Sequence, residues 1–185
     1  MKVGPAFVVC LGMMLMAGAM ASAQRHRDPF TRAEIDQIRD VSWEPQQRLA
    51  LYVKFARERL VAMETARNDP KTKNRAQLTH DKLDDFSLIY DELNDNIETY
   101  IDRKNDIRKP LKLIIDADGE FQAKLLALKN AADVPAAEAN QYEFVLGNAL
   151  ETLNESVEEH RKLLEEQQEA AKHKKFEKSA GGKAE

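Results

Sequence analysis

The chain has 185 residues, with 28 lysines and arginines against 32 aspartates and glutamates, and a formal net charge of −4. This mildly acidic balance argues against nucleic acid and anionic membranes as partners. The single cysteine, Cys10, lies near the N-terminus, which excludes disulfides, thiolate metal sites and cysteine nucleophiles in the rest of the chain. Charged residues make up 32% of the chain and aromatic residues 6%, which is typical of long solvated helices.

The first 23 residues predict a secretory signal peptide. Lys2 is the only charged residue before Arg25, and the apolar stretch Ala6–Met20 is followed by Ala-Ser-Ala. This pattern predicts cleavage between Ala23 and Gln24, and therefore a periplasmic or extracellular protein. The alternative is an uncleaved membrane anchor, because residues 3–23 are long enough to span a bilayer. No other stretch has the length and apolarity of a membrane span, so we expect no integral membrane protein once the signal is removed.

Residues 24–30 are expected to be a linker, and a helical bundle domain is expected over residues 31–171. A short first helix is predicted from Thr31 to residues 40–42. Thr31 and Glu34 form the two ends of a capping box, and Phe30 and Ile35 stand at the positions of a hydrophobic staple.

The second predicted helix covers residues 43–67, with Ser42 as its cap, Trp43 as a packing residue at its start and Pro45 in its first turn. Its apolar residues recur at alternating spacings of four and three. The third helix is predicted over residues 70–105, with Asp69 as cap and Pro70 as first residue. It has the strongest helical periodicity in the chain, carried by Leu83, Phe86, Tyr90, Leu93, Ile97 and Tyr100.

Pro110 interrupts the pattern, so the chain either reverses there or continues as one kinked helix; we favour reversal. A fourth helix is then predicted over residues 111–131. Within it, residues 113–121 contain Asp118-Gly119, a dipeptide that also suits the turn of a β-hairpin. The helical periodicity on both sides favours the helix.

The last helix is predicted to begin at residues 133–135 and to continue past Gln168, with His160 on its apolar face. Residues 172–185 are lysine-rich and lack apolar periodicity, so a disordered tail is expected there. The fold class is therefore all-α, an antiparallel bundle of one short helix and four longer, coiled-coil-like ones.

Charge alternates along the chain, segment by segment. Basic residues dominate at 48–75 (eight against three) and 103–129 (seven against four), whereas acidic residues dominate at 81–102 (eight against one) and 138–169 (nine against two). Because consecutive helices with short connections pack as antiparallel neighbours, opposite charges are expected at each contact between them.

Catalytic and cofactor motifs are missing from the sequence. No histidine stands three residues after a glutamate, as di-metal bundles require, and no phosphate-binding loop or nucleophile elbow occurs. We therefore predict no catalytic, cofactor or metal site, and a non-enzymatic interaction or structural protein with a protein partner or a second copy as partner. The alternative is a ligand- or metal-binding bundle around Tyr90, Asp118, Tyr142 and His160, because polar groups on apolar faces need partners.

Overall fold

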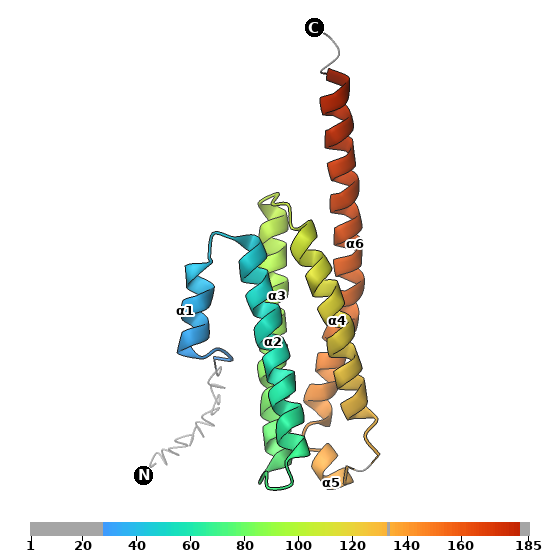
Figure 1. Ribbon diagram of the computed structural model, residues 1–185. Coiled ribbons are helices and arrows are strands. Elements are labelled where there is room, and N and C mark those ends of the chain that lie inside the picture. Colours follow the sequence, from blue (N-terminus) through green and yellow to red (C-terminus); the bar gives the residue numbers. More distant parts are fainter. Residues whose placement is uncertain (1–27, 133, 182–185) are drawn as a thin grey trace, which may run out of the picture.

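The computed structural model describes residues 28–132 and 134–181, with side chains described up to His173. The described chain is helical and contains no strand, which confirms the predicted all-α bundle. Figure 1 shows the long helices running side by side, with the first short helix beside them. Among the described residues, no helix combines the length and apolarity needed to cross a membrane. The predicted cleavage site, Ala23 and Gln24, lies outside the described residues.

Helix α1 (Arg32–Asp40) begins with the predicted capping box. The Thr31 hydroxyl accepts the Glu34 N–H at 3.3 Å, and the Glu34 carboxylate accepts the Thr31 N–H at 2.6 Å. Phe30, the expected staple partner of Ile35, packs edge-on against Tyr52 and Phe55 with ring centroids 5.8 and 6.1 Å apart. The residues before α1 therefore attach it to the bundle.

Helix α2 (Pro45–Asn68) corrects two details of the sequence prediction. The residue that precedes the helix is Glu44 rather than Ser42, because Pro45 occupies the first helical position and so fixes where the helix starts. Trp43, expected to pack, is 92% exposed. A residue in a connection outside the helix has no helical face to direct it into the core.

Helix α3 (Arg75–Asp102) begins five residues later than predicted, and Pro70 lies outside it. Asp69 ends α2, and its carboxylate accepts the Lys71 N–H at 2.9 Å, which closes a local turn instead of capping a helix. Asn74 then takes a left-handed conformation with φ 55°, which asparagine tolerates better than most residues.

Helix α4 (Arg108–Lys129) follows a reversal at residues 103–107, as favoured from the sequence. Pro110 lies in its first turn, where a missing N–H breaks no helical hydrogen bond. Residues 113–121 are helical, so the hairpin alternative is excluded, and Asp118 faces the core.

The last predicted helix is divided in two. Helix α5 (Ala136–Ala139) is a single turn, and helix α6 (Glu143–Gly181) follows after residues 140–142. The backbone of α6 continues as helix to Gly181, past Lys172, where a disordered tail was expected. The alanine, lysine and glutamate residues of this segment are strong helix formers, and they extend the helix without an apolar face.

The order of helices around the bundle is not their order along the chain. Helices α2 and α3 pack together along their length, as do α4 and α6, and the remaining sides are formed by α2 with α4 and by α3 with α6. Helices α3 and α4, although consecutive, lie diagonally opposite each other. The pairs α2–α3 and α4–α6 are therefore antiparallel, and the pairs α2–α4 and α3–α6 are parallel (Figure 1).

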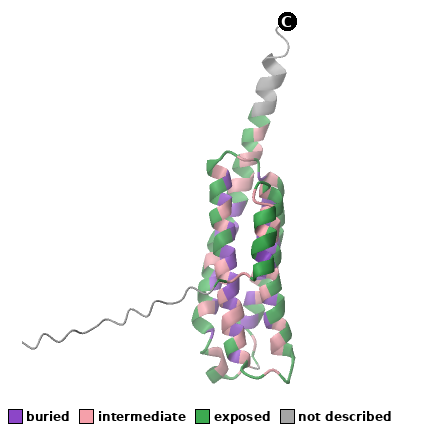
Figure 2. Ribbon diagram, turned by 90° about the vertical axis from the view of Figure 1, so that its left-hand side faces the viewer, coloured by how far each residue is buried: buried purple, intermediate pink, exposed green. Residues whose placement is uncertain are grey.

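The core is one continuous cluster along the inner faces of α2, α3, α4 and α6, shown in purple in Figure 2. Phe86 stacks on Tyr90 at 5.7 Å, and Phe121 meets both rings edge-on. Helix α6 projects beyond its neighbours, whereas α3 runs alongside α2 (Figure 1).

Candidate functional site

A buried polar cluster crosses the middle of the bundle between α3, α4 and α6. It consists of Tyr90, Asn94, Asp118, Ser156 and His160. The Asp118 carboxylate is 0% exposed and accepts the Tyr90 hydroxyl at 2.7 Å through one oxygen. Its other oxygen lies 2.9 Å from Nδ1 of His160. Nε2 of His160 lies 3.2 Å from the Asn94 amide oxygen, and the Asn94 amide nitrogen donates to Ser156 at 2.9 Å.

The polar groups of this cluster satisfy one another. Burial raises the pKa of the Tyr90 hydroxyl far above its ordinary value, and the Asp118 carboxylate raises it further, so Tyr90 remains a neutral donor. The two ring nitrogens of His160 lie beside oxygens of Asp118 and Asn94, so this ring joins α6 to both α4 and α3. A closed set of hydrogen bonds specifies how three helices meet, which is a structural task.

The sequence placed Asp118, His160 and Tyr90 among the candidate ligand-binding residues, and the structure brings these three together. Tyr142 lies elsewhere. The Arg67 guanidinium lies over its ring, with Cζ 5.5 Å from the centroid of the Tyr142 ring. Asn94 was missed because an asparagine on a helix gives no periodic signal of its own. Among the described residues, no group of three or more histidine, cysteine, aspartate or glutamate side chains is arranged to hold a metal ion.

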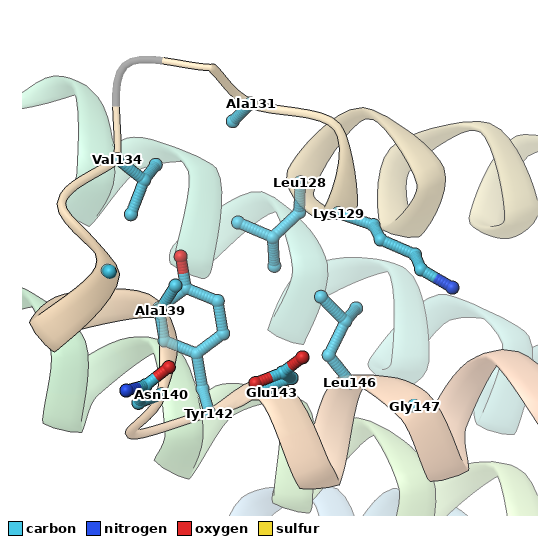
Figure 3. Close-up of a pocket in the computed structure, with 11 residues that line it drawn as sticks. Leu128, Lys129, Ala131, Val134, Ala139, Asn140, Tyr142, Glu143, Leu146 and Gly147 are labelled. Carbon is cyan, nitrogen blue, oxygen red and sulfur yellow. The ribbon is translucent and has the colours of Figure 1, made fainter.

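A pocket of about 350 Å³ lies at the end of the bundle where α4, α5 and α6 meet. Figure 3 shows Leu128 from α4 and Leu146 from α6 pointing into it beside Tyr142 and Val134, while Lys129 extends away from them. Its size is in the range of small-molecule sites, and its lining is mostly apolar.

The arrangement of the helices corrects the expectation of opposite charges at every contact. Contacts α2–α3 and α4–α6 do join a basic to an acidic helix. The other two contacts join like to like, because α2 lies beside α4 and α3 lies beside α6. One wall of the bundle is therefore basic (α2 and α4) and the opposite wall is acidic (α3 and α6).

In the basic wall, acidic residues form ion pairs where the two helices meet. Arg57 of α2 contacts Glu120 of α4 at 2.8 Å, and Lys124 of α4 contacts Glu64 of α2 at 2.6 Å. The acidic wall shows the effect of crowding like charges. Partial removal from water raises the pKa of Asp91, and the neighbouring Asp95 and Glu92 carboxylates raise it further.

A groove of about 340 Å³ runs between α3 and α6 on the acidic wall, towards the end from which α6 projects. We name it the acidic groove. Ile101 and Leu163, both partly buried, supply its apolar surface. Its other lining residues are Glu98, Asp102, Glu159, Lys162 and Glu166. Lys162 is 3.9 Å from Glu166, so the one cation of the lining already has a partner in its own helix.

Two further ion-pair clusters have structural roles. Arg59 of α2 reaches Glu34 of α1 at 2.7 Å and the Pro29 carbonyl at 2.7 Å, which holds α1 against the bundle. Glu138 of α5 accepts from Arg67 at 3.1 Å and from Arg75 at 2.7 Å. These ion pairs help to attach α1 and α5 to the long helices.

The described residues thus define an all-α bundle with a closed polar core, one basic wall and one acidic wall that carries a groove. No known protein family, curated protein or solved structure matches the chain.

Proposed function

We propose that this chain is an exported, non-enzymatic interaction protein whose acidic groove binds a positively charged protein segment bearing an apolar residue. The groove supports this proposal because it combines two features. Its carboxylates are exposed and clustered on two neighbouring helices, and Ile101 and Leu163 offer apolar surface between them. Charge would steer a basic partner to the wall, and apolar contact would hold it.

The burial of the polar cluster also supports a non-enzymatic role. Its aspartate–histidine pair is the arrangement in the described residues most similar to a catalytic pair, yet Asp118 is 0% and His160 3% exposed. Tyr90 and Asn94 already donate to partners within the cluster. A substrate would therefore have to break the core to reach the pair.

Binding is tested with a fluorescent oligolysine peptide that contains one phenylalanine. We expect the double variant Glu98→Gln with Glu159→Gln to lose most of the binding, and the matched variant Glu151→Gln with Asp116→Asn to keep it. Both variants remove two negative charges from the surface, but only the first removes them from the groove. Equal loss in the two variants would show attraction to net charge alone and would refute the groove as a site.

Export is tested on protein produced from the full-length sequence. We expect an intact mass that corresponds to a chain beginning at Gln24, and recovery in the periplasmic or extracellular fraction. A full-length chain recovered from the cytosol would contradict the export part of the proposal. A full-length chain in the membrane fraction would support the anchor alternative.

The second candidate function is binding of a small apolar ligand, which the pocket beside Tyr142 favours. Gly147 lines this pocket, and a side chain added there would meet open space. We therefore expect Gly147→Leu to fill the pocket and abolish binding of a small hydrophobic dye. Gly119→Leu is the matched control, because Gly119 is also helical, open and absent from the pocket lining. Dye binding unaffected by Gly147→Leu would remove this candidate.

A further inference from the structure

Helix α6 leaves the bundle beside the acidic groove. Gln167 is the last described side chain of α6 with hydrogen bonds to another element: it donates to the Asn105 carbonyl at 3.0 Å and accepts the Ile107 N–H at 3.0 Å. Beyond this point α6 runs clear of the other helices to its end at Gly181 (Figure 1). A helix that projects without tertiary contacts is only marginally stable in water, so a partner that packs on it would stabilise it.

The projecting end of α6 has the composition that the acidic groove would bind. Residues 172–178 contain four lysines and Phe176, against a single acidic residue. The groove offers four carboxylates around two aliphatic side chains. One chain therefore carries both halves of a complementary pair.

A single copy cannot use this complementarity, because its α6 continues away from its own groove. We propose that the basic end of α6, residues 172–178, docks in the acidic groove of a second copy, and that this exchange is reciprocal. The inference rests on the proposed function of the groove and names its occupant. In a symmetric dimer, every contact is made twice by the same residues.

The lengths along α6 agree with this arrangement. Two α6 helices laid antiparallel about a two-fold axis near Glu169 place residues 172–178 of each copy beside residues 160–166 of the other. At 1.5 Å per residue, both segments are about 9 Å long. The two bundles then meet end to end without overlapping, because each α6 leaves its bundle near Gln167.

The test uses two charge-reversed variants of the full-length protein, with sedimentation to measure association. The tail-reversed variant changes Lys174, Lys175 and Lys178 to glutamate. We expect wild type to dimerise and this variant to be monomeric, with a dissociation constant raised at least about tenfold, since several exposed ion pairs become repulsive.

The groove-reversed variant changes Glu98, Asp102 and Glu159 to lysine, and it should also be monomeric by itself. A mixture of the two variants gives the sharpest outcome. The acidic tail of one faces the basic groove of the other, and the basic tail faces the acidic groove, so mixing two monomers should restore a dimer. Failure of the mixture to associate would overturn reciprocal docking.

Controls separate docking from folding and from net charge. Reversal of Lys71 and Lys73, which are exposed in the α2–α3 connection at the opposite end of the bundle, should leave dimerisation unchanged. Truncation after Ala171 should give a monomer that still unfolds cooperatively, because it removes only residues beyond the core, and it serves if a reversed variant does not fold. A truncated chain that still dimerises would refute the inference.

The proposed function fails independently of this inference. A wild-type monomer that binds the lysine-rich peptide in its groove, with loss in the groove variant, would overturn the dimer but retain the groove. A wild-type dimer that persists after groove reversal, with peptide binding unchanged, would overturn both.

Discussion

Replacement of Asp118 by alanine removes the acceptor on which the buried polar cluster depends. The carboxylate is 0% exposed and accepts from Tyr90 at 2.7 Å, and it lies 2.9 Å from the ring of His160. In the alanine variant both partners keep their buried positions without this acceptor. Water cannot replace it without entering a packed core.

The magnitude follows from the hydrogen bonds to Tyr90 and His160 that the substitution removes. Each buried polar group left without a partner costs about 1–3 kcal/mol. With two such groups, we expect Asp118→Ala to lower the free energy of unfolding by about 2–6 kcal/mol, out of about 5–15 kcal/mol for a domain of this kind. Tyr90→Phe removes one donor only and should cost about 1–2 kcal/mol.

Urea denaturation followed by far-ultraviolet circular dichroism measures these differences. Asp116→Ala is the matched control, because Asp116 is an exposed aspartate on the same helix, and its effect should stay within about 0.5 kcal/mol. A loss below about 1 kcal/mol for Asp118→Ala, with an unchanged dependence on urea, would refute the view that this cluster holds the three helices together.

Three further predictions concern the helices individually. Burial by itself would raise the pKa of Glu34, but the hydrogen bonds from Arg59 and from the capping box outweigh it and hold the pKa below 4.5. The ionised Glu34 therefore stabilises the folded protein above about pH 4.5, and this stabilisation is lost as the pH falls through the lowered pKa. Thermal melts should therefore show Glu34→Gln less stable than wild type at neutral pH, with the difference shrinking below about pH 4.5; a gap independent of pH would contradict this. Gly119→Ala should stabilise the protein by about 0.5–1 kcal/mol in urea, since a methyl group there meets open space and favours the helix; destabilisation would reveal a steric clash at that position. Leu153→Ala, at 0% exposed, should cost about 2–5 kcal/mol, whereas Leu113→Ala, at 42% exposed, should cost far less; similar losses would argue against the assigned core.

The sequence identified helices wherever an apolar stripe was long. Residues 83–100 and 111–128 lie within helices as predicted, because helical periodicity is a local property that survives without knowledge of neighbours. Boundaries were less accurate. Asp69 is suited both to cap a helix and to close a turn. In the structure it closes a turn, and α3 begins only after Asn74, which has a left-handed conformation.

For the candidate site residues, too, some properties could be predicted from the sequence and others could not. Asp118 and His160 stood out in the sequence because each is a polar residue on an apolar face. Their pairing could not be predicted, because 42 residues separate them and the sequence does not say which helices face each other. The carboxylates of the acidic groove lie in the two segments that are acidic in the sequence, but their juxtaposition could not be predicted, since Glu98 and Glu159 belong to helices that are not consecutive in the chain.

The sequence by itself determined which segments are helices, which faces are apolar and how charge is divided among the segments. Only the tertiary structure decided which helices are neighbours. Short connections make consecutive helices antiparallel, but they do not force them to touch, and the chain passes from α3 to α4 across the diagonal of the bundle. That crossing places α3 beside α6, and so turns an alternation of charge along the chain into two opposed walls.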